Sequence, residues 1–145
     1  MKLSTKGRYG LRAFVDIAIY SEETPVSLAD VAKRQDISIS YLEQLMTKLK
    51  KANLVQAVRG AQGGYELTKD PSEISVGDVL RALEGDLSPA ECATEEETCE
   101  HSCGATGHCT TRLVWKKIND SVNDTINNIF ISELIEDSKR SQKEG

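Results

Sequence analysis

Residues 27–68 read SLADVAKRQDISISYLEQLMTKLKKANLVQAVRGAQGGYELT, and the order of elements in this stretch decides the fold. Ser27 and Asp30 start a helix of about two turns, because a hydroxyl and a carboxylate three residues apart satisfy free backbone N–H groups. A second helix follows a turn over 36–40, and one of its faces is polar and basic. Its apolar stripe comprises Leu42, Leu45, Met46 and Leu49.

A β-hairpin is predicted next, because two alternating runs, 55–59 and 65–68, flank the Gly-rich tip GAQGG. Two short helices followed directly by a hairpin are typical of a winged helix-turn-helix, whose second helix enters the major groove of DNA. The hairpin then reaches the minor groove, where we expect Arg59 to insert. Glycines in the tip, Gly60 among them, would let the backbone approach phosphate closely. A plain hairpin turn fits this segment as well, whereas a nucleotide-binding loop does not, since no helix follows it.

Outward from this core, helices are expected over 5–20, over 75–85 and from residue 110 onward, where apolar positions recur at helical spacing. The fold class is therefore mainly α with a small β-hairpin. Four parts are predicted: a winged helix-turn-helix DNA-binding domain over 1–85, a cysteine-rich loop over 86–109, a dimerisation helix with a terminal helix over 110–137, and a disordered tail over 138–145. The helix from residue 110 has an apolar face without an obvious partner, so a second copy of the chain is its natural partner.

Several polar residues of the second short helix have two interpretations. Ser40 and Glu43 spell S-x-x-E, which favours a capping box slightly over a DNA contact, since a carboxylate repels phosphate. Tyr41 and Gln44 are either solvated helix residues or DNA-reading ones, and a glutamine can make paired hydrogen bonds to adenine. Lys48 is expected to contact phosphate on any sequence.

Composition and charge agree with a globular DNA-binding chain. Of the 145 residues, 39% are hydrophobic and 28% are charged, which excludes a disordered or collagen-like chain. The net charge of −5 is unevenly placed, since residues 1–70 hold 11 Lys and Arg against 8 Asp and Glu, and residues 71–145 hold 7 against 15. Without a membrane span or a secretion signal, the chain is expected in the cytoplasm. No nucleophile is paired with a base, so an enzyme is not expected.

The four cysteines follow the pattern C-x6-C-x3-C-x5-C. In a cytoplasmic chain such a cluster indicates metal ligands or redox thiols rather than structural disulfides. No pair shows the C-x2-C spacing of common zinc fingers, which lowers the case for zinc without removing it. Thiolates bind iron–sulfur clusters or zinc well.

Six motifs are similar to those of the IscR/NsrR/CymR family of winged helix-turn-helix transcription factors. They are LSTKGRY at 3–9, SISYLEQL at 38–45, VRGAQGGYEL at 58–67, ISVGDVL at 74–80, the cysteine loop, and RLVW at 112–115. The resemblance implies a homodimer that binds a double-stranded DNA operator and dimerises through the long helix. The residues that it places on DNA are Ser38, Ser40, Tyr41, Glu43, Gln44, Arg59 and Gly60.

The same resemblance implies an iron–sulfur cluster, of the 2Fe–2S type, held by Cys92, Cys103 and Cys109. Arg112 stands where the family has a histidine, and it cannot ligate iron. The fourth ligand is therefore open among Cys99, His101, His108 and an oxygen donor, and a register that uses Cys92, Cys99 and Cys109 is an alternative.

The predicted function is a transcription regulator that acts as a repressor, senses a bound iron–sulfur cluster and controls cluster-biogenesis genes. One alternative within the same fold is a repressor that senses nitric oxide or thiol oxidation with the same cysteines. Another, from a different class, is a structural zinc-bearing module that docks a partner protein.

Overall fold

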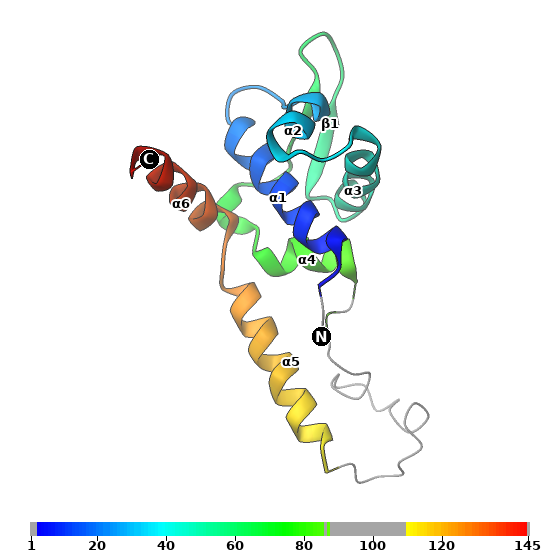
Figure 1. Ribbon diagram of the computed structural model, residues 1–145, viewed down its shortest axis with the longest axis vertical. Helices are drawn as coiled ribbons and strands as arrows, with labels where there is room; N and C mark the ends of the chain where they lie inside the picture. The colour runs from blue at the N-terminus through cyan, green and yellow to red at the C-terminus, as the bar shows by residue number, and fades with distance from the viewer. Residues whose placement is uncertain (1–2, 86, 88–109, 145) are drawn as a thin grey trace.

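The computed structural model describes residues 3–85, 87 and 110–144. Its elements, in chain order, are α1 (Thr5–Tyr20), α2 (Leu28–Gln35), α3 (Ile39–Lys51), β1 (Val55–Val58), β2 (Gly64–Leu67), the short 3-10 helix η1 (Pro71–Glu73), α4 (Val76–Glu84), α5 (Arg112–Asn127) and α6 (Ile131–Glu144). Figure 1 shows α1 to α4 and the hairpin gathered into one body, from which α5 extends away. The predicted fold class, mainly α with one hairpin, is confirmed.

Helix α1 is the centre of this body, because α2, α3, α4 and α6 all contact it. Its buried face packs against apolar side chains from the other helices, and α1 also contacts β2. The largest fully buried side chains are Phe14, Ile17, Val31, Leu42, Leu45, Met46, Leu49, Ile74, Val79, Leu83 and Ile131.

The helix boundaries follow local capping chemistry. The hydroxyl of Ser27 accepts a hydrogen bond from the Asp30 N–H and begins α2, as predicted. Ser75 and Asp78 form a full capping box at the start of α4, and Gly85, with φ of +80°, ends that helix.

The predicted capping box of Ser40 and Glu43 is wrong. Helix α3 begins earlier, and its N-cap is Ser38, whose hydroxyl accepts from the Tyr41 N–H at 3.2 Å. The reason lies in the preceding turn: Asp36 adopts a left-handed conformation with φ of 54° that ends α2, and Ile37 is buried in the core. The chain has therefore already turned at Ser38, two residues before Ser40.

The end of the chain also differs from the prediction. Where a disordered tail is expected over 138–145, α6 continues to Glu144. Ile131 and Ile135 anchor the helix in the hydrophobic core, and Lys139 forms an ion pair with Glu22 at 3.4 Å. These tertiary contacts order a segment whose hydrophilic sequence suggests no structure of its own.

Candidate DNA-binding face

Helix α3 presents a polar face on the outside of the helix-turn-helix. Its apolar stripe is buried against the core, so the opposite side chains are exposed by the period of the helix. Exposed along that side are Ser40, Glu43, Gln44, Thr47 and Lys48. The last turn adds Lys48, Lys50 and Lys51, a basic cluster suited to phosphate.

Two of the predicted DNA-contacting residues have roles inside the chain. The Ser38 hydroxyl is occupied as the N-cap of α3. Tyr41 is half-buried: its hydroxyl lies 3.4 Å from the Thr5 hydroxyl, and its ring packs edge-on against Tyr9 with 6.4 Å between centroids. Tyr41 therefore joins the first turn of α3 to the first two turns of α1, and its contact with DNA stays a prediction.

The wing is an antiparallel hairpin in which Val55 pairs with Leu67 and Val58 with Gly64. Arg59 and Gly60 are exposed at its tip, where the predicted minor-groove contact requires them. Gly60 has φ of +120°, a backbone conformation that disfavours any side chain.

The other two glycines of the tip are explained by packing within the chain. A Cβ on Gly63 would lie 2.3 Å from the Val58 carbonyl oxygen, and one on Gly64 would lie 2.3 Å from the Val26 carbonyl oxygen. The close approach to Val26 is itself structural, because Val26 and Tyr65 exchange two backbone hydrogen bonds of 2.9 and 2.8 Å. These bonds tie the start of β2 to the segment that precedes α2.

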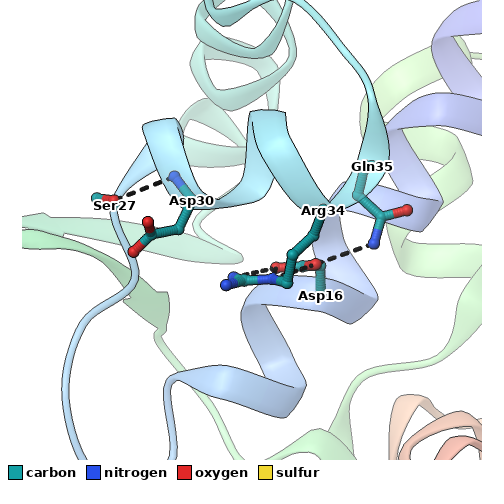
Figure 2. Close-up of polar contacts among 5 residues, drawn as sticks. All are labelled: Asp16, Ser27, Asp30, Arg34 and Gln35. Atoms are coloured by element: carbon teal, nitrogen blue, oxygen red, sulfur yellow. Dashed lines mark hydrogen bonds and ion pairs between the residues drawn. The ribbon is translucent and has the colours of Figure 1, made fainter.

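A buried carboxylate locks the helix-turn-helix onto α1 (Figure 2). The guanidinium of Arg34 donates to both oxygens of Asp16, with distances of 2.7 and 2.9 Å, and the Gln35 amide donates to the same carboxylate at 2.9 Å. The hydrogen bond to Asp16 raises the pKa of Arg34 above its ordinary value, so the guanidinium stays charged. Arg34 also covers the ring of Tyr20, 4.0 Å from its centroid.

This network was not predicted from the sequence, although the position of Asp16 in the sequence indicates it. Asp16 is the one charged residue within the run 13–19, whose other members are all apolar. A charged residue at such a position requires a partner, and a basic residue in the next helix is the natural choice.

The predicted cluster ligands Cys92, Cys99, Cys103 and Cys109 lie outside the described residues. Within the described part of the chain, no group of three or more His, Cys, Asp or Glu side chains could hold a metal ion. The segment that carries the cysteines connects the end of α4 to the start of α5, and these two helices contact each other.

A basic recognition helix, a wing with an exposed arginine and a rigid helical scaffold define a winged helix-turn-helix DNA-binding protein. Residues 3–137 match the Rrf2 family, described as iron-dependent transcriptional regulators, and the chain belongs to this family. It is therefore a transcription regulator that binds DNA and is not an enzyme. Among the described residues, no helix is long and apolar enough to span a bilayer.

Individual relatives cover nearly the whole chain. The HTH-type transcriptional regulator IscR of Serratia proteamaculans (strain 568) is 42% identical over 135 residues, 93% of this chain and 79% of that protein. The structure of T. potens IscR superposes with a TM-score of 0.79 at 39% identity, covering 98% of this chain and 91% of that one. CymR, the global cysteine regulator of B. subtilis, gives a TM-score of 0.75 at 38% identity and covers 94% and 97%.

Proposed function

We propose that the chain is a repressor that senses an iron–sulfur cluster bound by Cys92, Cys103 and Cys109. The observation that carries the proposal is the set of four cysteines within the segment 86–109 of a chain 42% identical to an IscR. Three soft thiolates suit a cluster of the 2Fe–2S type. The fourth ligand is Cys99, His101, His108 or an oxygen donor, because Arg112 occupies the position of the family's histidine.

The exposed residues of α3 and the wing are proposed to bind an operator with two half-sites. Gln44, Ser40 and Glu43 meet the major-groove base edges, Lys48 meets phosphate, and Arg59 with Gly60 meets the minor groove. Two copies of the chain pair through α5, in the cytoplasm where the operator lies. By analogy with IscR relatives, the regulated genes are those of cluster biogenesis.

Anaerobic reconstitution followed by operator binding tests the sensing function. The protein is loaded with iron and sulfide, its visible absorbance is recorded, and its affinity for an operator selected from random duplexes is measured with and without the cluster. A red-brown protein whose operator affinity depends on the cluster supports the proposal. A colourless zinc-containing protein, or a thiol-oxidation response without any chromophore, contradicts it.

Single cysteine variants test the ligand set. Cys92→Ala, Cys103→Ala and Cys109→Ala should each abolish the chromophore, because loss of one anchor leaves an iron open to water and oxygen. Cys99→Ala decides the fourth position: a bleached protein indicates four thiolates, and an unchanged spectrum indicates a histidine or oxygen ligand. A chromophore that survives loss of Cys103 but not of Cys99 would show that Cys99 takes the place of Cys103.

A further inference from the structure

A carboxylate from the end of α4 holds the first turn of α1. Oε1 of Glu84 accepts hydrogen bonds from the backbone N–H of Ser4 at 3.0 Å, from the Ser4 hydroxyl, and from the backbone N–H of Gly7 at 2.8 Å. The first N–H groups of a helix have no partner within it, and the N-terminal end of the helix favours a negative charge. Glu84 satisfies both requirements from a position 77 residues further along the chain than Gly7.

The two helices are close enough for this contact because α1 has glycines where it faces α4. A Cβ on Gly7 would lie 2.6 Å from Oε1 of Glu84, and a Cβ on Gly10 would lie 2.4 Å from a methyl carbon of Leu83. A side chain at Gly7 would therefore displace the carboxylate from its hydrogen bonds.

The turn that Glu84 holds is also the turn that touches the recognition helix. Thr5 lies between Ser4 and Gly7, and its hydroxyl meets the Tyr41 hydroxyl, while Tyr9 supports the Tyr41 ring one turn further on. Tyr41 stands in the first turn of α3, next to the exposed Ser40 and close to the other predicted base-contacting residues. A continuous set of contacts thus joins Glu84 to the part of α3 that must be placed correctly in the major groove.

We propose that Glu84 is a positioning residue for DNA recognition: by holding the first turn of α1, it fixes Tyr41 and with it the first turn of α3. This inference concerns DNA recognition itself and requires no cluster. It goes beyond the proposed sensing function, since none of its residues is a cluster ligand.

Removing the negative charge of Glu84 distinguishes a positioning role from an electrostatic one, because the two roles change DNA affinity in opposite directions. Glu84 is negative, so replacing it with glutamine should by itself slightly strengthen binding to any DNA. If Glu84 positions α3, the same replacement should instead weaken specific binding. A loss of operator affinity on removal of a negative charge has no explanation in phosphate attraction.

The test uses the full-length, metal-free protein and measures dissociation constants for the selected operator and for a random duplex at fixed salt. Glu84→Gln is expected to weaken operator binding about tenfold, the scale of one lost base contact, and to leave random-duplex binding equal or tighter. Glu23→Gln is the control, because it makes the same charge change at an exposed residue between α1 and α2. It should leave operator binding equal or slightly tighter.

A second variant reaches the same contact from the other helix. Gly7→Ala displaces the Glu84 carboxylate, while alanine favours the helix at residue 7. This variant therefore replaces Glu84→Gln in the test if Glu84→Gln unfolds at the assay temperature. It should weaken operator binding as Glu84→Gln does.

A double-mutant cycle then asks whether Glu84 acts through Tyr41. In a Tyr41→Ala background, Glu84→Gln should lower operator affinity by no more than about twofold, because the side chain through which Glu84 acts is already removed. Equal losses in both backgrounds, or unchanged or tighter operator binding by both Glu84→Gln and Gly7→Ala, would overturn the proposal. Because no cluster is present in any arm, failure here is distinct from failure of the sensing function.

Discussion

At the scale of single residues, the structure separates side chains that can read DNA from those already used by the fold. Gln44, Glu43 and Lys48 are exposed on α3, and Glu43 takes no part in the N-cap of that helix. Ser38 caps the helix instead, and the Tyr41 hydroxyl contacts the Thr5 hydroxyl on α1. We therefore expect α3 to read bases mainly through exposed side chains such as Gln44. Its amide can donate and accept a hydrogen bond at the same base, which makes it the most specific of them.

Gln44→Ala should lower the affinity for the selected operator by roughly 1 to 3 kcal/mol and relax the base preference, because a paired hydrogen bond to a base edge is lost. Lys48→Ala serves as the comparison, since loss of a phosphate contact weakens all sequences alike and reduces the salt dependence. Competition binding with operator and random duplexes measures both effects. Equal losses on the two duplexes for Gln44→Ala would remove its base-reading role.

Glu84 also gives the stability a pH dependence. Hydrogen bonding by Ser4, and then by the Gly7 backbone, lowers the pKa of Glu84 below its ordinary value, although burial opposes the shift. A carboxyl whose pKa is depressed on folding stabilises the fold above its unfolded pKa of about 4.3, and this contribution is lost as pH falls through the folded pKa. Urea unfolding should show the wild type more stable than Glu84→Gln at pH 6, with a difference that shrinks below about pH 4. A constant difference from pH 7 to pH 3 would contradict this assignment.

At the scale of elements, α5 and α6 contrast. Helix α6 returns to the core, where Ile131 is fully buried and its N–H donates to the Ile74 carbonyl at 2.9 Å. Helix α5 buries none of its residues, and its first two turns expose large apolar side chains. These exposed residues are Leu113, Val114, Trp115 and Ile118. Such a stripe on an extended helix supports the proposed pairing of two copies through α5.

Ile118→Asp should yield a folded monomer. The side chain is 38% exposed in the single chain, so the substitution costs little there, whereas in a dimer it would bury an unpaired charge at several kcal/mol. Sedimentation should report the change in mass, and circular dichroism should report unchanged helix content. Lys116→Asp, on the opposite side of α5, is the control and should remain dimeric. Wild-type protein that sediments as a monomer at micromolar concentration would exclude the α5 interface.

At the scale of the whole molecule, α4 contacts both α1 and α5 and lies between them (Figure 1). Its end holds α1 through Glu84, and Arg81 donates to the side-chain oxygens of Asn123, at 3.1 Å, and Asn127 on α5. The segment 86–109 joins these two helices. If a change at the cysteines is transmitted to the DNA-binding face, we expect it to pass through the contacts that α4 makes with α1 and α5.

Arg81→Leu should uncouple the cluster from DNA binding. The variant keeps all four cysteines, so its visible spectrum should match the wild type, but it loses the polar contacts between α4 and α5. The ratio of operator dissociation constants with and without cluster should move toward one. Lys117→Leu, which removes a cation from an exposed position on α5, should preserve the ratio. A full cluster effect in Arg81→Leu would show that this contact is not the route.

The sequence by itself determined the elements whose signals are local. Apolar spacing predicted α1, α3 and α4, and alternation around glycines predicted the wing. The exposed face of α3, and with it Gln44 and Lys48, followed from the same periodicity. These features depend on neighbours within a few residues, which a single sequence displays directly.

Only the tertiary structure decided which residues meet across the chain. It moved the cap of α3 to Ser38, since the burial of Ile37 sets where the chain turns. It extended α6 to Glu144, since Ile131 and Ile135 find a core made by other elements. It also brought Glu84 to the start of α1. Each of these outcomes depends on contacts between residues far apart in sequence, whose burial and hydrogen bonding outweigh the weak local preferences that a sequence pattern records.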